Sequence, residues 1–217
     1  MNRNLLSAAH LLLISIAILA GETAKGRDQS TGNFSLGTRN TISMFNDDAA
    51  IGTGIGGQCR FQFMDKLNSE WYADYIPSQT KITHRDDYHI GWSVMYYFGK
   101  NVHFDHLLQP YLIAGHCFDY SVVSQIGNHA NNADRLSSAT QAGLGTHINI
   151  TKRFDCSLSA QYMLHFGHEI ETDPNKVSPE GNIDIHRSEF VKPDGHLLFT
   201  ISFNYKFVNF WNGWNSI

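Results

Sequence analysis

Gly195-His-Leu-Leu-Phe-Thr-Ile-Ser-Phe-Asn-Tyr-Lys-Phe207, close to the end of the 217-residue chain, alternates strictly from Leu197 onward. One set of alternate positions holds Leu197, Phe199, Ile201, Phe203, Tyr205 and Phe207; the other holds Leu198, Thr200, Ser202, Asn204 and Lys206. Successive side chains of a β-strand point to opposite faces, so the pattern predicts a strand with one wholly apolar face. Such a face requires either a packed core or lipid against it.

Seven earlier segments repeat this alternation, at about 33–45, 51–63, 69–77, 88–99, 109–121, 138–150 and 154–166. In the segment 109–121 the phase is ambiguous, and we favour Tyr111, Ile113 and Cys117 on the apolar face. Each run is about long enough for a tilted strand to cross the hydrocarbon of a membrane. The eight segments together predict an all-β fold, an eight-stranded antiparallel up-and-down transmembrane β-barrel.

The first twenty residues have the character of a secretion signal. Arg3 supplies a positive charge, and Leu11–Ala20 is an apolar run too short to span a bilayer. We therefore expect a signal peptide at 1–20, a short N-terminal extension at 21–32, the barrel at 33–207 and a C-terminal tail at 208–217.

Aromatic residues near the expected strand ends favour a membrane barrel over a water-soluble one, which would show the same alternation with its apolar side chains inside. Phe61, Phe98 and Phe207 would lie near one membrane interface, and Tyr75 and Tyr88 near the other. The connections 78–87, 122–137 and 167–194 are long, and most of the others are short. Long external loops and short periplasmic turns are typical of outer-membrane barrels. We therefore expect the bacterial outer membrane as the location.

Composition excludes several other classes. The net charge is −4 without a basic run, so a nucleic-acid partner is not expected. Three cysteines in strand-like runs argue against a disulfide framework. Twelve histidines are present, but no spacing typical of a zinc site. We predict no cofactor and no metal; the weak alternative is a cation held by His165, His196 and His168.

Charged residues fall on the polar face of several predicted strands. We expect Arg39, Arg60, Glu70, Asp74 and Lys206 to form a salt-bridge network in the lumen. Because the second and third strands form a hairpin, Arg60 should reach Glu70 or Asp74. An eight-stranded barrel has room inside for side chains rather than a wide channel. A narrow gated conduit is the alternative.

The chain resembles the small outer-membrane β-barrels of the OmpA and OmpX type, described as porin-family or surface-antigen barrels. The resemblance rests on Gly52-Thr-Gly-Ile-Gly-Gly57, Pro110-Tyr-Leu-Ile-Ala-Gly115, Ala142-Gly-Leu-Gly-Thr-His147, Ser159-Ala-Gln-Tyr-Met163 and Phe203-Asn-Tyr-Lys-Phe207. It implies a non-enzymatic structural or surface-interaction role. It also implies contact with outer-membrane lipid and lipopolysaccharide, assembly by the barrel assembly machinery, and a possible extracellular partner at the loops. Family members commonly end on the last strand's aromatic residue, whereas this chain continues beyond Phe207.

An enzyme is the remaining alternative, because some eight-stranded outer-membrane barrels are lipid A deacylases. The segment Tyr162-Met-Leu-His-Phe-Gly-His168 is similar in outline to their His-x-Ser site. Gly167 stands where the nucleophilic serine is expected, and glycine cannot form an acyl intermediate. We therefore expect no catalytic residues, no hydroxyl beside His165, and a rim position for His165 with a hydrogen bond to a loop.

Overall fold

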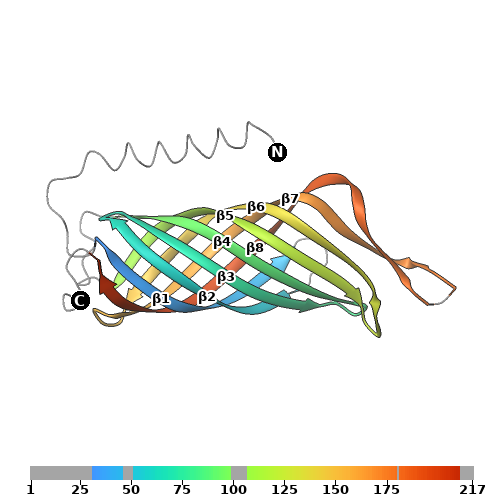
Figure 1. Cartoon of the computed structure of the whole chain (residues 1–217), viewed down its shortest axis with the longest axis horizontal. Coiled ribbons are helices and arrows are strands. Elements are labelled where there is room, and N and C mark those ends of the chain that lie inside the picture. The colour runs from blue at the N-terminus through green and yellow to red at the C-terminus, as the bar shows by residue number, and fades with distance from the viewer. Residues whose placement is uncertain (1–30, 46–50, 99–106, 180, 211–217) are drawn as a thin grey trace.

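The computed structural model describes residues 31–45, 51–98, 107–179 and 181–210. The predicted signal peptide, the 46–50 connection and most of the tail lie outside these ranges and stay predictions. Eight strands form one closed antiparallel barrel in chain order (Figure 1). They are β1 (Asn33–Phe45), β2 (Ile51–Met64), β3 (Leu67–Gln79), β4 (Thr83–Tyr97), β5 (Leu108–Gln125), β6 (Asn128–Asn149), β7 (Phe154–Val177) and β8 (Ile183–Asn209). No helix among the described residues is long and apolar enough to span a membrane.

The two faces of the wall have opposite chemistry. Large apolar side chains such as Ile90, Phe118 and Ile201 are exposed on the outside, whereas most of the buried side chains are polar or charged. A water-soluble barrel would have the reverse arrangement. β8 pairs with β1 along Asn33–Phe45 and so closes the barrel. Closure leaves no unpaired strand edge facing the lipid, which could not satisfy its hydrogen bonds. The predicted eight-stranded transmembrane β-barrel is confirmed.

The predicted phase of β5 is wrong. Tyr111, Ile113 and Cys117 point into the barrel and are almost completely buried, whereas Leu112, Phe118 and Tyr120 are exposed on its outer face. Both faces of this strand carry apolar residues, so alternation alone does not choose between them. The choice depends on the neighbouring strand: Gly145, the register partner of Tyr111, has no side chain and leaves room for the Tyr111 ring.

Two of the expected long loops are continuations of strands. β5 and β6 pair from Leu108 to Gln125 and turn at Ile126–Gly127, where Gly127 has φ 86°. β7 and β8 continue pairing as far as Val177 and Ile183. The third long connection, 78–87, contains only a short turn between β3 and β4. These extensions were missed because beyond the lipid both faces are polar, so no alternation marks a strand there.

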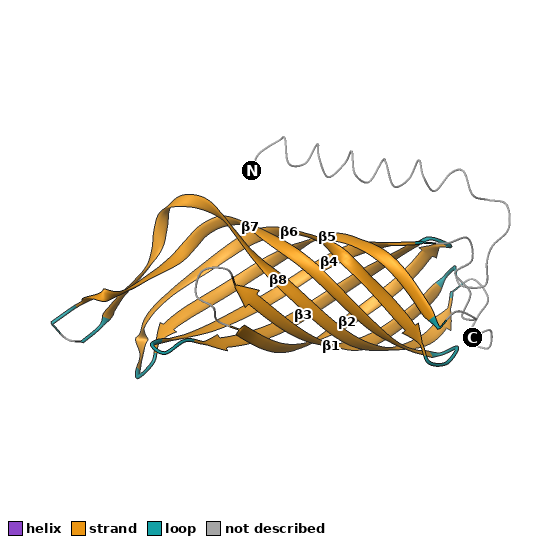
Figure 2. Ribbon diagram, turned by 180° about the vertical axis from the view of Figure 1, so that it is seen from behind, coloured by secondary structure: helices purple, strands orange, loops and turns teal. Residues whose placement is uncertain are grey.

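The β7–β8 hairpin is the longest of these extensions and projects well past the barrel (Figures 1 and 2). Pairing between β6 and β7 stops at Ser138 and Phe166, so the hairpin leaves the wall at that level. It contacts the β5–β6 hairpin again further out. The Asn131 amide donates to the Ile183 carbonyl at 2.8 Å, and Arg187 forms an ion pair with Asp134 at 2.8 Å. The two outer hairpins therefore support each other.

Candidate functional site: the polar lumen

The end of the lumen nearest the described chain termini contains an ion cluster centred on Asp155. The Arg60 Nη2 atom lies 2.6 Å from Asp155 Oδ1, and the Lys206 Nζ atom lies 3.4 Å from Asp155 Oδ2. His147 Nδ1 lies 2.6 Å from Ser157 Oγ and 2.9 Å from Arg60 Nη1. Because arginine only donates, His147 accepts and its ring is neutral. A small cavity of about 30 Å³ lies beside this cluster, which is space for water rather than for a solute.

A second ion cluster lies in the middle of the lumen around Arg39. Its guanidinium donates to Glu70 at 2.6 Å and to both oxygens of Asp74 at 3.0 Å. The same group lies 4.1 Å from the centre of the Tyr72 ring, a cation–π contact. All three charged side chains are nearly inaccessible. Buried charges of this kind are tolerated only because each has partners.

An apolar layer lies next along the lumen. It contains Tyr72, Ile76, Cys117, Ala139, Met163 and Leu198, all buried. Water is unfavourable beside side chains this apolar. The layer lies between the Arg60 cluster and the groups nearer the hairpin end, whereas Asp74 of the Arg39 cluster is the register partner of His89 and adjoins those groups.

The hairpin end of the lumen contains a cluster of His89, Asp119, His165 and His196, here called the outer cluster. Asp119 lies two residues beyond Cys117 on β5, and His165 two beyond Met163 on β7, so the cluster stands directly above the apolar layer. Asp119 contacts His89 and His165, each at 3.3 Å. His165 Nε2 lies 3.2 Å from His196 Nδ1. All four side chains are at most 1% exposed.

The five residues that the sequence predicted for a lumen network all point inward, but not into one network. Arg39, Glu70 and Asp74 form one cluster, while Arg60 and Lys206 join the other through Asp155. The predicted partner of Arg60 is wrong. Arg60 is the register partner of Glu70, yet its side chain extends across the lumen to Asp155 on β7. Adjacency in the sheet did not decide this contact, because the narrow lumen brings opposite walls within reach of an arginine.

Two expectations about His165 are also wrong. It is buried in the lumen rather than at a loop, and the Ser137 hydroxyl lies 3.0 Å from its Nδ1 atom. Asp119 approaches that same nitrogen. In a Ser-His-Asp triad the serine and the carboxylate bind opposite ring nitrogens, so this arrangement lacks the relay geometry.

The sequence grouped His165 with His196, as part of the weak cation alternative, but it did not reveal the outer cluster with His89 and Asp119. Its members come from β4, β5, β7 and β8, at positions 89, 119, 165 and 196. The inward phase of each histidine was the only available signal. Within the described ranges, no group of three or more His, Cys, Asp or Glu side chains is arranged to hold a metal ion. His168, part of the weak cation alternative, lies outside the lumen and contacts the Ser188 carbonyl at 2.8 Å.

Comparison with known proteins supports the fold but does not identify a function. No family model and no curated protein matches the sequence. Neisserial surface protein A is similar in structure, with a TM-score of 0.56 and 15% identity over 81% of this chain and 96% of that chain. A major outer membrane protein from Thermus thermophilus gives a TM-score of 0.54 and 9% identity, over 81% of this chain and 98% of that chain. The fold is that of the small outer-membrane β-barrels, as the resemblance in the sequence predicted, and the apolar outer wall places the chain in the outer membrane.

Proposed function

We propose that the protein is a closed, non-enzymatic barrel that anchors and presents its two long outer hairpins. The observation that carries this proposal is the filling of the lumen. Along the described part of the lumen lie two buried ion clusters and an apolar layer, and this filling supports a closed interior. With a blocked interior, the features left for contact with the surroundings are the lipid-facing wall and the hairpins.

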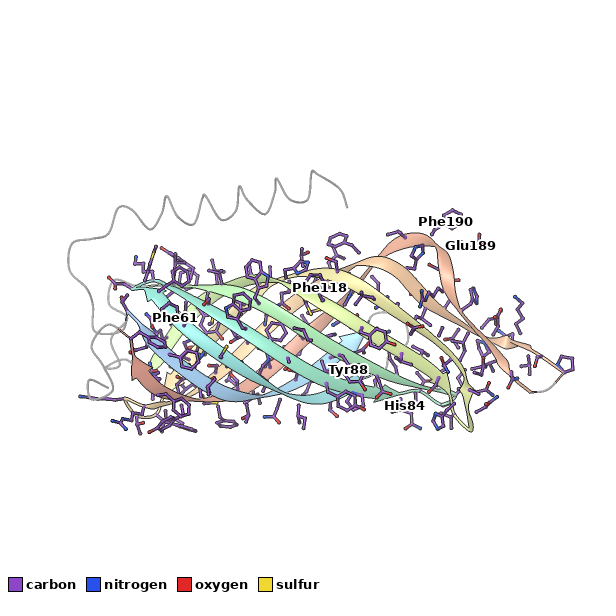
Figure 3. The ribbon with its side chains drawn as sticks, viewed as in Figure 1. Phe61, His84, Tyr88, Phe118, Glu189 and Phe190 are labelled. Carbon is purple, nitrogen blue, oxygen red and sulfur yellow. The ribbon has the colours of Figure 1, made fainter. Side chains whose placement is uncertain are left out.

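The β7–β8 hairpin supports the interaction role. Its described part exposes Glu189 and Phe190, which project from the bend of the hairpin (Figure 3). A hydrogen bond from Lys176 lowers the pKa of the Asp184 carboxyl, and the same contact raises the pKa of the Lys176 ammonium. The expected partners are outer-membrane lipid, lipopolysaccharide and a protein at the hairpins, with the assembly machinery acting during insertion.

Ion conductance in planar bilayers tests the closed lumen. The purified wild-type barrel should show no discrete conductance steps. A double variant, Met163→Ala with Leu198→Ala, thins the apolar layer and leaves both ion clusters untouched, so it should leak more than the wild type. Stable, uniform steps from the wild type would contradict a closed barrel and favour the narrow conduit.

One observation favours a second candidate, a hydrolase acting on a membrane lipid. His116 Nε2 lies 2.7 Å from Ser138 Oγ, and both side chains lie on the outer wall, where acyl chains would pass. No carboxylate contacts the His116 ring among the described residues, so the orienting group of a triad is lacking. Mass spectrometry of lipid A from cells that express wild type or Ser138→Ala decides the matter. Loss of an acyl chain that depends on Ser138 would make this candidate the leading one.

A further inference from the structure

The outer cluster has an unusual charge balance that the proposed function does not explain. The cations near it are Arg85 and Arg135, and the carboxylates are Asp87, Asp119 and Asp194. Among the described residues, the lumen shows the same excess of one carboxylate. The cations are Arg39, Arg60, Arg85, Arg135 and Lys206, and the carboxylates are Glu70, Asp74, Asp87, Asp119, Asp155 and Asp194. An uncompensated buried charge costs several kcal/mol, so one further positive charge is expected inside.

Histidine is the residue that can supply that charge, and the contacts indicate which one does. The Ser137 hydroxyl donates to Asp119 Oδ2, so His165 Nδ1 is assigned as the N–H that donates to Ser137 Oγ at 3.0 Å, with Asp119 3.3 Å away. The opposite nitrogen, Nε2, then accepts from His196 Nδ1 at 3.2 Å. This hydrogen bond forms with both rings neutral. At the far end of the lumen, His147 is neutral because it accepts from Arg60.

His89 differs from the other lumen histidines. Its Nε2 atom lies 3.3 Å from Asp119 Oδ1, and neither ring nitrogen forms a hydrogen bond of good geometry. Asp119 Oδ1 likewise forms no hydrogen bond of good geometry. A proton on both nitrogens of His89 would place a positive charge directly against this carboxylate. The His89 ring also stacks on His196, with 5.9 Å between centroids.

We propose that the outer cluster is a proton-binding site that holds one imidazolium, on His89, at neutral pH. Further protonation of His165, at Nε2, breaks its hydrogen bond from His196, and protonation of either ring adds positive charge to a cluster that already faces Arg135. Arg135 lies 3.4 Å from Asp194 on β8 and 3.7 Å from Asp119 on β5. Asp194 is the register partner of His165, at the level where the β7–β8 hairpin leaves the wall. Acidification therefore loosens the base of the hairpin.

The surroundings of the cluster determine the side from which protons arrive. The charged groups that face it are Arg85 and Asp87 on β4, Arg135 on β6, Asp194 on β8, and Asp74 on β3, which is bound to Arg39. The apolar layer lies directly below and separates it from the Arg60 cluster. Protons should therefore enter from the hairpin end, which faces outside the cell if the N-terminus is periplasmic. The protonation state of the outer cluster then follows the pH of the external medium.

Nitrogen-15 NMR of histidine-labelled protein in micelles at pH 7.5 tests the charge state directly. The wild type should show one buried imidazolium, and the His89→Gln variant should lack that signal. The rings of His165 and His196 should give the shifts of neutral tautomers. Three neutral rings in the outer cluster, or a charge on a ring other than His89, would overturn the proposal. This measurement on the wild type does not depend on any variant folding.

Urea unfolding between pH 7.5 and 5 tests the response to acid. Unfolded histidine titrates near pH 6.5. If the folded cluster binds two protons fewer than the unfolded chain, it should raise the unfolding constant about 100-fold per pH unit below that value. His196→Gln should reduce this contribution to about tenfold per unit. The half-exposed His186 provides the control, because His186→Gln should follow the wild type. Equal acid responses of wild type and His196→Gln would overturn the proposal.

Discussion

Arg60 on β2 and Asp155 on β7 meet inside the barrel, with 2.6 Å between Nη2 and Oδ1, although their strands are not neighbours in the sheet. The contact joins opposite parts of the wall. Both side chains are almost fully buried, and Asp155 also faces Lys206. The pair therefore links chain segments that backbone hydrogen bonds alone do not join.

Asp155→Asn should lower the free energy of unfolding by about 3–5 kcal/mol, because Arg60 and Lys206 would stay buried without their carboxylate. Urea titration followed by heat-modifiable gel migration measures this loss. Lys176→Ala removes an ion pair whose lysine is 73% exposed, and it should leave the midpoint nearly unchanged. Similar midpoints for both variants would mean that water screens the lumen.

The inward position of Tyr111 can be tested at the glycine that faces it. A Cβ atom at Gly145 would collide with the Tyr111 ring, whereas a Cβ at Gly57 would meet nothing closer than 3.8 Å. Gly145→Ala should therefore destabilise the barrel by about 1–3 kcal/mol through overpacking. Gly57→Ala, also in a strand, should be nearly neutral. The same urea titration applies, and equal effects of the two alanines would argue against this packing.

The lipid-facing wall can be tested at Ile201, which is 43% exposed on β8. Ile201→Arg should cost up to about 2–4 kcal/mol and reduce insertion, since lipid must then solvate a charge. Ile201→Leu keeps the apolar surface and should insert like the wild type. Folding into lipid vesicles, measured by gel migration, gives the comparison. Normal insertion of the arginine variant would place this face away from lipid.

His165→Ala should leave lipid A acylation unchanged, and a serine-reactive probe should not label Ser137 in the folded barrel. His165 and Ser137 point into a packed lumen, where both are at most 3% exposed, so a lipid acyl chain has no access. Mass spectrometry of lipid A and of probe-treated protein provides the readout. Probe labelling of Ser137 that disappears in His165→Ala would show that the outer cluster has a nucleophile after all.

Much of the fold could be predicted because lipid imposes a simple rule on each strand. The side chains of β8 alternate from Leu197 to Phe207, and the structure puts the apolar set outside throughout. The rule failed in two places. In β5 both faces are apolar, and beyond the membrane β6 and β7 are polar on both faces, so neither the phase nor the strand ends could be read there.

The candidate site was less predictable than the wall. The inward direction of Arg39, Arg60, Glu70, Asp74 and Lys206 follows from strand phase. Which carboxylate each cation binds depends on distances across the lumen, and these are set only when the barrel closes. The same holds for His89 and His165, which are 76 positions apart in the chain and contact one carboxylate, Asp119.

The sequence by itself determined that this chain forms a closed eight-stranded barrel with an apolar outside, because period-two alternation is a local property that each strand carries independently. Only the tertiary structure decided the partner of Arg60, the phase of Tyr111 and the assembly of the histidines around Asp119. These are contacts between strands far apart in the chain, and they depend on closure, register and the space left by facing side chains.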